Sequence, residues 1–222
     1  QPSLISLPQD LARASAKQKY TDLISKSSAI NTLSAARLFL FGARDVWFVV
    51  ALPVYLASSF GWVHWQVGAF LALWIIGYGV VQANAPRILA RADGRTPDGR
   101  TAFHWALLLS LVPAAIALLL LSGLSPQASL VGGLLGFGVL FAVNSALHSF
   151  LIVDYAAEDG VSLDVGFYYM ANAMGRLLGT VLSGWVFQSW GLEACLWISA
   201  LFLLLAALLS LSLPRHPAAS AA

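Results

Sequence analysis

Long uninterrupted runs of apolar residues are the feature of this sequence that most restricts its fold. Six such runs occupy residues 36–58, 66–88, 102–123, 129–153, 165–189 and 193–213 of the 222-residue chain. Each run has at least the roughly 20 helical residues that are needed to cross a bilayer. Charged residues make up only 10% of the chain and hydrophobic residues 59%, whereas soluble domains carry about 25% charged residues. The sequence therefore predicts a multi-pass membrane protein.

Helices rather than strands are expected within these runs. A transmembrane barrel has segments of ~10 residues in which apolar and polar side chains alternate, whereas these runs stay apolar for about twice that length. The loops predicted on one side of the membrane have only a few residues, so successive helices are expected to be antiparallel neighbours. We therefore predict an all-α membrane protein built on a bundle of six transmembrane helices.

The distribution of basic residues predicts the orientation of this bundle. If six helices alternate in direction, all the basic residues outside the helices fall on one side of the membrane. The loops of the other side, around residues 58–65, 122–128 and 189–193, contain no lysine or arginine. By the positive-inside rule both ends of the chain are predicted to be cytoplasmic. The residues on the predicted cytoplasmic side are Arg13, Lys17, Lys19, Lys26, Arg37, Arg87, Arg91, Arg95, Arg100 and Arg215.

Three regions are predicted along the chain. Residues 1–33 are interpreted as a cytoplasmic linker, residues 34–214 as the six-helix bundle and residues 215–222 as a cytoplasmic tail. The polar first region lacks the early apolar core of a secretory signal, and its first residue, Gln1, indicates that a further segment precedes it. Binding of this region to anionic lipid through Lys17, Lys19 and Lys26 is the alternative to the linker interpretation.

Small residues recur at helical spacing in the fourth and fifth runs. Gly132 and Gly136 lie in the fourth run, and the fifth contains a stripe of Ala171, Gly175, Gly179 and Ser183. Small residues four apart let another helix backbone approach closely, because lipid supplies no hydrophobic drive for helix association. We expect the fifth helix to be packed inside the bundle. A homodimer contact through the same stripe is the alternative.

A few polar side chains interrupt the apolar runs. An ionisable residue in a transmembrane span costs a few kcal/mol on insertion scales, so such residues usually face inward and serve a function. Spacings of four residues place Asn172, Arg176 and Thr180 on one helix face, and Asn144 and His148 on another. The ionisable residues are Arg44, Asp45, His148 and Arg176, and their neutral companions are Gln82, Asn84, Asn144, Asn172 and Gln188.

Each ionisable residue also has a structural explanation. Arg44 could pair with Asp45 beside it, or extend its guanidinium group to the cytoplasmic interface. Arg176 could pair with a carboxylate elsewhere in the bundle or in a partner. His148 could be a neutral imidazole that is hydrogen-bonded to a neighbouring helix.

The functional interpretation follows from the balance of charge. Asp45 is the one carboxylate well inside a predicted helix, and it cannot neutralise both Arg44 and Arg176. Guanidinium groups bind phosphate and carboxylate through paired hydrogen bonds. We therefore predict that Arg44 contacts an anionic solute, and that Asp45 orients Arg44 or, like His148, carries a coupling proton. The predicted binding residues are Arg44, Asp45, Asn144, His148, Asn172 and Arg176.

Signatures of soluble chemistry are absent from the sequence. It contains no phosphate loop, no zinc-like cysteine and histidine spacing, no nucleophile elbow and no basic run suited to nucleic acid. We therefore predict no enzymatic activity, no cofactor, no metal site and no nucleic-acid partner. A membrane enzyme would need a cluster of catalytic acids or histidines at one depth, and a channel would conduct without saturating, so a transporter is favoured over both.

The order of these features resembles the C-terminal half of a major facilitator superfamily transporter. The segment "LARADGR", residues 89–95, is similar to the loop signature L-A-D-R-x-G-R of that superfamily, although Arg91 stands where the signature has aspartate. The segments at 34–56, 68–89 and 166–188, among them "GFYYMANAMGRLLGTVLSGWVFQ", resemble the ArsJ-type organoarsenical exporters within the superfamily. The resemblance extends from about residue 10 to residue 213.

This resemblance implies a secondary transporter in a bacterial inner membrane. The implied substrate is 1-arseno-3-phosphoglycerate, an anion formed when glyceraldehyde-3-phosphate dehydrogenase uses arsenate, and its export would confer arsenate resistance. The implied partners are that enzyme, the lipid bilayer and an N-terminal six-helix half, because such transporters have two halves around a central site. A generic efflux permease for another organic anion or drug is the alternative. Coupling to protons and passive export of the anion both stay open.

Overall fold

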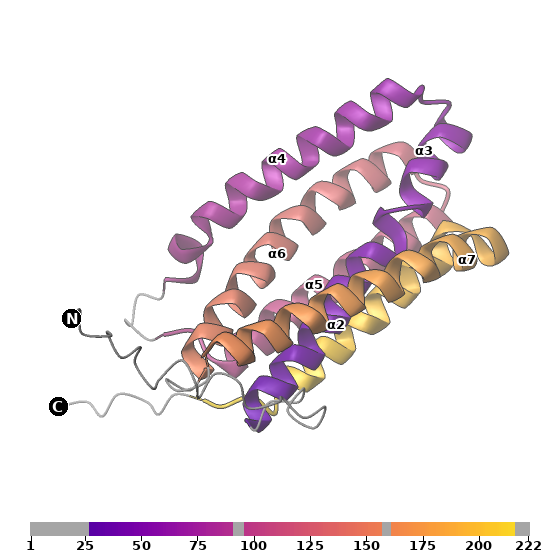
Figure 1. The fold of residues 1–222 in the computed structure, drawn as a ribbon. Coiled ribbons are helices and arrows are strands. Elements are labelled where there is room, and N and C mark those ends of the chain that lie inside the picture. Colours follow the sequence, from indigo (N-terminus) through magenta and orange to yellow (C-terminus); the bar gives the residue numbers. More distant parts are fainter. Residues whose placement is uncertain (1–26, 91–95, 157–160, 216–222) are drawn as a thin grey trace, which may run out of the picture.

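The computed structural model of the chain describes residues 27–90, 96–156 and 161–215. Within these ranges every regular element is a helix, which confirms the all-α prediction for the part described. Figure 1 shows long helices that run side by side. In chain order they are α2 (Ser28–Phe48), α3 (Ala51–Phe60), α4 (His64–Leu89), α5 (Gly99–Leu121), α6 (Pro126–Tyr155) and α7 (Val161–Ser210).

The long helical segments do not correspond one to one with the six predicted helices. In the described ranges five helical segments are long and apolar enough to cross a membrane. The first combines α2 and α3, and the last is α7, which contains both the fifth and the sixth predicted runs. The count of six is therefore not confirmed.

The backbone of α7 leaves the helical conformation at Gly191, which has φ 83° and ψ −175°. Residues with a Cβ rarely adopt such a positive φ, which explains why glycine stands there. The Gly175 carbonyl and the Phe202 ring, which come from opposite sides of this point, both lie close to Gly42. Helix α7 therefore has two antiparallel arms, 161–190 and 192–210, which Figure 1 shows in orange and yellow.

The first span is interrupted between α2 and α3. Pro53 lies in the first turn of α3, and proline lacks an N–H group and clashes with the carbonyl four residues before it, so the helix breaks there. The backbone amides of Val50 and Ala51 donate instead to Ser183 Oγ on α7, at 3.3 and 3.1 Å. Ser183 therefore stabilises the break by accepting hydrogen bonds that the helix cannot accept.

Small residues on the first arm of α7 allow its backbone to contact α2. A Cβ added at Gly179 would lie 2.6 Å from the Gly42 carbonyl oxygen and 3.0 Å from Asp45 Cβ. Gly175 lies even closer to the backbone of Leu38. Two glycines of the predicted stripe are therefore packed inside the chain, as expected for a fifth helix within the bundle, and α2 covers the surface that a dimer contact would need.

The glycines of α6 that contact neighbouring helices are not the predicted pair. A Cβ added at Gly132 or Gly136 would meet no heavy atom within 4 Å in the described part of the chain. The close approaches occur at Gly133, beside a side chain of α5, and at Gly138, where an added Cβ would lie 2.8 Å from Trp74 Nε1. The prediction for Gly132 and Gly136 is wrong within these residues, because α5 and α4 cross α6 on other faces.

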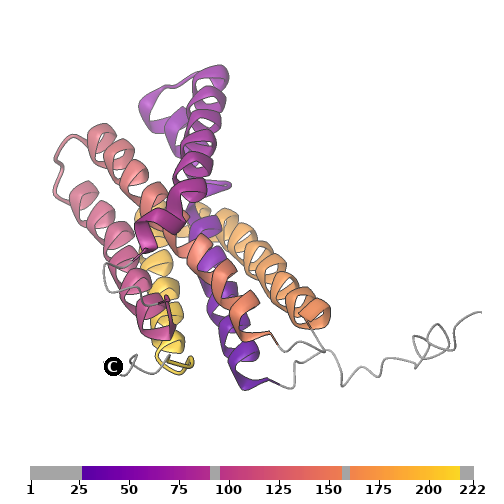
Figure 2. The ribbon, with the colours of Figure 1, turned by 90° about the vertical axis from the view of Figure 1, so that its left-hand side faces the viewer.

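Large apolar side chains are exposed around the outside of the molecule. Helix α4 packs along α6 and lies at the edge of the bundle, as Figure 2 shows. Its outer faces expose Leu73, Ile75, Ile76 and Val80, each by more than half of its surface. Lipid rather than water is the solvent that suits such faces. This exposure, together with the five long apolar segments, identifies a multi-pass membrane protein.

Candidate functional site

Asp45 is buried between two arginines. Arg44 Nε donates to Asp45 Oδ1 at 2.6 Å, and Arg176 Nε, from the first arm of α7, donates to Asp45 Oδ2 at 3.2 Å. The side chains of Asp45 and Arg44 are 1% and 14% exposed, whereas that of Arg176 is 54% exposed. The local Arg44–Asp45 pair considered from the sequence is therefore present. The same carboxylate also holds α2 against α7.

Arg37, two turns before Arg44 on α2, is a third arginine of this region. Only 5% of it is exposed. Its Nε donates to Asn172 Oδ1 at 3.1 Å, and its Nη1 donates to the Ser145 carbonyl oxygen at 3.1 Å. The guanidinium group also stacks over the rings of Phe41 and Tyr168, at 4.1 and 5.0 Å. In the described part of the chain no carboxylate lies within ion-pair distance of Arg37.

Phe41 joins the two arginines of α2. Spacings of four and three residues place Arg37, Phe41 and Arg44 on one helix face. The Arg44 guanidinium lies 5.1 Å from the Phe41 ring centre and 5.3 Å from that of Phe141 on α6. Both cations therefore contact aromatic faces, whose negative quadrupole attracts positive charge.

The two polar residues predicted on α6 have different surroundings. Asn144 Nδ2 donates to the carbonyl oxygens of Trp105 and Leu140, at 3.0 and 2.9 Å, so its amide connects α6 to α5. His148 is fully buried and neither of its ring nitrogens has a hydrogen-bond partner. Arg37 is close enough to act on His148 electrostatically.

The predicted binding residues therefore divide into two groups. Arg44, Asp45 and Arg176 form one ion-pair cluster, and Asn172 contacts Arg37 with His148 nearby. The amide of Asn144 makes its contacts with α5 instead. Across α2 and the first arm of α7, the described residues include three arginines and two buried aspartates, and Asp45 is the aspartate that pairs with Arg44 and Arg176. These elements therefore carry an excess of one positive charge in the described residues, the same excess as was expected from Arg44, Arg176 and Asp45.

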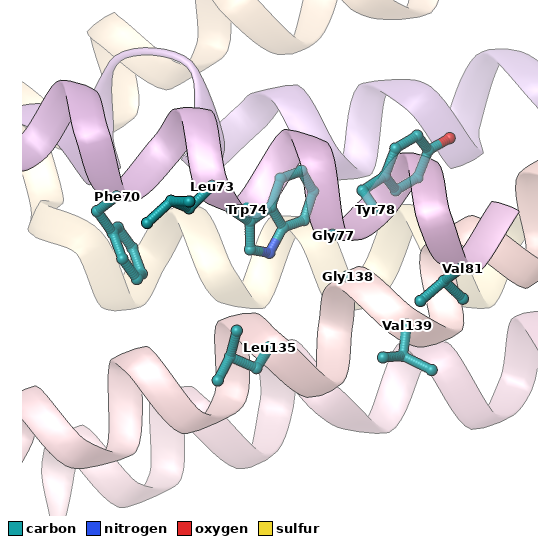
Figure 3. Close-up of a pocket in the computed structure, with 9 residues that line it drawn as sticks. All are labelled: Phe70, Leu73, Trp74, Gly77, Tyr78, Val81, Leu135, Gly138 and Val139. Atoms are coloured by element: carbon teal, nitrogen blue, oxygen red, sulfur yellow. The ribbon is translucent and has the colours of Figure 1, made fainter.

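An apolar cavity of about 360 Å³ lies between α4 and α6. Figure 3 shows aromatic side chains of α4 on one side of it and aliphatic side chains of α6 on the other. Trp74 Nε1 donates to the Leu134 carbonyl oxygen at 2.9 Å, and the Trp74 ring stacks on Tyr78. The Tyr78 ring lies 5.9 Å from Phe141, which also contacts Arg44. The lining residues are Phe70, Leu73, Trp74, Gly77, Tyr78, Val81, Leu135, Gly138 and Val139.

Comparison with known proteins adds one match to this geometry. The family model described as Major Facilitator Superfamily matches residues 33–222. The chain belongs to the major facilitator superfamily. No curated protein matches it. The family match does not separate organoarsenical exporters from other branches of the superfamily.

Membership of the major facilitator superfamily explains the main properties of the molecule. Proteins of this superfamily are secondary transporters that move small solutes across a lipid bilayer and are generally not enzymes. Ionisable groups inside their spans belong to solute or ion pathways as a rule. The loop "LARADGR" that resembles a superfamily signature lies largely outside the described residues, as do the lysines proposed for lipid binding.

Arg37 is a residue of this candidate site that was not predicted from the sequence. It was assigned to the cytoplasmic basic residues because it stands near the start of the first apolar run. Helix α2 begins earlier, at Ser28, where Ser27 Oγ accepts from Ile30 N at 3.4 Å, so Arg37 lies well inside the helix. The spacing Arg37, Phe41, Arg44 was the available signal, because it places both arginines on one face.

Proposed function

We propose that this chain is the C-terminal six-helix half of a secondary transporter for an organic anion. The observation that carries the proposal is that Arg44 and Arg176 share one carboxylate, that of Asp45, while Arg37 on the same face of α2 binds neutral oxygens. Burying a charge without a partner costs several kcal/mol. A bound anion would offset that cost for the arginines that exceed the carboxylates in the bundle. A cationic or neutral solute would gain nothing from this arrangement.

The chain supplies one wall of the transport pathway in this proposal. The other wall comes from an N-terminal six-helix half, joined through the polar segment that precedes α2, and both ends of the chain lie in the cytoplasm of a bacterial cell. Arg176 is half exposed and lies on the first arm of α7, so we place that face toward the second half. The two halves then rock around a site near the middle of the bilayer.

Asp45 has a specific role in this mechanism. In the absence of solute it occupies both Arg44 and Arg176, and an incoming oxyanion competes with it for their N–H groups. Protonation of Asp45 would weaken both ion pairs at once, which offers a route for proton coupling. Collapse of the proton gradient without effect on transport would exclude this route.

The resemblance to ArsJ-type exporters supports 1-arseno-3-phosphoglycerate as the substrate, and arsenate resistance as the consequence of its export. Glyceraldehyde-3-phosphate dehydrogenase would then supply the substrate. The phosphate group of this anion suits guanidinium recognition. A generic permease for another organic anion is the second candidate, because the same arginines would bind any phosphate or carboxylate.

The test is the total arsenic content of arsenate-exposed cells that express the full-length transporter together with glyceraldehyde-3-phosphate dehydrogenase. We expect arsenic to fall only when both proteins are present, and Arg44→Gln or Arg176→Gln to abolish the effect. Arg87→Gln is the matched control, because Arg87 is exposed near the end of α4 and, among the described residues, is hydrogen-bonded to Asn84.

Two other outcomes separate the candidates. Arsenic that does not change on expression of the wild-type transporter removes the arsenical substrate and leaves the generic anion permease. If Arg44→Gln and Arg176→Gln both leave the transport of every tested anion unchanged, the anion proposal itself is removed. A rate that does not saturate with solute concentration would indicate a channel.

A further inference from the structure

Arg37 differs from the other two arginines of the site in its partners. Arg44 and Arg176 share the carboxylate of Asp45. The hydrogen bonds of Arg37 go to two neutral oxygens, those of the Asn172 amide and the Ser145 carbonyl. Arg37 is also the most buried of the three, with 5% of its surface exposed. A neutral oxygen reduces the cost of burying a cation but does not cancel its charge.

His148, on which Arg37 acts electrostatically, is a second unsatisfied group of this region. Its Nδ1 and Nε2 are buried and lack hydrogen-bond partners, although a neutral imidazole has one N–H to donate and one nitrogen to accept with. Buried polar atoms in native proteins are almost always paired, so an unpaired imidazole within electrostatic range of a cation that has no carboxylate partner in the described residues favours binding of a polar ligand there. The ligand that satisfies both groups is an anion.

The geometry around Arg37 leaves donors free for such a ligand. A guanidinium group has five N–H bonds in a planar fork, and the contacts to Asn172 and Ser145 use two of them. Asn172 is partly exposed and lies one helical turn from Arg176, so Arg37 contacts the face of α7 that carries Arg176. The rings of Phe41 and Tyr168 hold the guanidinium plane in place.

We propose that Arg37, oriented by Asn172 and flanked by His148, binds the oxyanion head of the transported solute. The solute class is an organic anion that ends in a phosphate or a carboxylate. The inference rests on the proposed function and assigns the primary anion contact to Arg37 rather than to Arg44. Arg44 and Arg176, held by Asp45, attract the anion toward this site. Access requires the rocking motion of the two halves.

Asn172→Asp is the decisive variant. It replaces the amide oxygen that accepts from Arg37 Nε at 3.1 Å by a carboxylate of the same shape, which neutralises Arg37 from within the protein. A residue with a purely structural role would tolerate this change, because the new ion pair is stronger than the hydrogen bond that it replaces. The inference predicts that stability is kept or raised while anion binding is lost.

The matched control is Asn84→Asp. Asn84 Oδ1 accepts from Arg87 Nη1 at 3.2 Å in an exposed pair on α4, so the control makes the same chemical change on an arginine outside the site. Each variant is prepared in the full-length transporter in lipid nanodiscs. The probe is 3-phosphoglycerate, a stable anion with both a phosphate and a carboxylate. Binding is measured by titration calorimetry and stability by thermal unfolding.

We expect Asn172→Asp to bind 3-phosphoglycerate about 10- to 100-fold more weakly than the wild type, as for loss of a hydrogen bond to a charged group. Its melting temperature should not fall, and Asn84→Asp should bind normally. Competition by inorganic phosphate or by acetate shows which head group occupies the site. If Asn172→Asp fails to fold, Arg37→Lys is tested in its place. Lysine keeps the positive charge but lacks the forked donors of the guanidinium group, so a comparable loss of 3-phosphoglycerate binding is expected.

Normal binding by folded Asn172→Asp, or by Arg37→Lys where that variant is used, overturns the assignment of Arg37. The proposed function survives in that case if Arg44→Gln or Arg176→Gln weakens binding. Absence of binding of 3-phosphoglycerate, phosphate and acetate to the wild type removes both proposals. The two failures are therefore distinguishable.

Discussion

Gly179 is the position where a single methyl group tests the packing that assembles the site. An added Cβ would lie 2.6 Å from the carbonyl oxygen of Gly42 and 3.0 Å from Asp45 Cβ. Real Cβ atoms essentially never approach another heavy atom closer than 3.0 Å. The oxygen belongs to the backbone of α2, so α2 and the first arm of α7 must separate by roughly 1 Å in Gly179→Ala.

Overpacking of this kind costs about 1–3 kcal/mol, partly offset by the helix propensity of alanine, which exceeds that of glycine by about 1 kcal/mol. Gly184→Ala is the control, because it lies on the same arm and its Cβ would meet nothing within 4 Å in the described residues. It gains the propensity without the clash. The difference between the two variants therefore isolates the packing term.

The assay is thermal unfolding of the full-length transporter in nanodiscs, combined with anion transport. We expect the melting temperature of Gly179→Ala to lie about 3–10 °C below that of Gly184→Ala. Transport should also fall, because the displaced Asp45 no longer holds Arg176 at 3.2 Å. Equal melting temperatures for the two variants would refute the close α2–α7 contact.

Three further changes test the contacts around the site by thermal unfolding. Ser183→Ala should destabilise the transporter by about 1–3 kcal/mol, because two amides at the α2–α3 break lose their acceptor. The control Ser110→Ala removes a hydrogen bond within its own helix. Equal losses of stability in the two variants would contradict the role of Ser183 as that acceptor. Gly138→Ala should lower stability and alter the fluorescence of the indole that it faces, whereas Gly136→Ala should keep or raise stability through the helix propensity of alanine and leave the fluorescence unchanged. Asp45→Asn should cost about 3 kcal/mol by leaving a buried guanidinium uncompensated, and removal of the adjacent arginine in the same protein should restore part of that loss.

Much of the architecture could be predicted from the sequence because the bilayer imposes simple requirements. Length and apolarity located the membrane spans to within several residues, and the stripe containing Gly175 and Gly179 indicated which helix would be packed inside. Turns proved harder to predict. The backbone leaves the helical conformation at Gly191 within α7, and Pro53 breaks the first span into α2 and α3, so the helices do not correspond one to one with the apolar runs.

The candidate site was predicted in part. Arg44, Asp45 and Arg176 stood out because charged residues are rare in apolar runs, and the structure brings these three together. Arg37 was missed, since its position near the end of a run suggested an interfacial residue. Asn144 was assigned to the site on spacing, but its amide contacts α5. Spacing along one helix shows which residues share a face, and it does not show which helix that face meets.

The sequence by itself determined that the chain crosses a membrane, that its spans are helical and that arginines outnumber acids within them. These properties follow from composition and local spacing, since the energetics of lipid act on each segment separately. Only the tertiary structure decided which charges are paired. Asp45 is adjacent to Arg44 in the chain, but Arg176 reaches it from another helix, and Arg37 is left with neutral partners because Asn172 and Ser145 occupy its side of the bundle. Charge balance within a membrane depends on contacts between helices far apart in sequence, and for that reason packing leaves Arg37 without a carboxylate partner in the described residues.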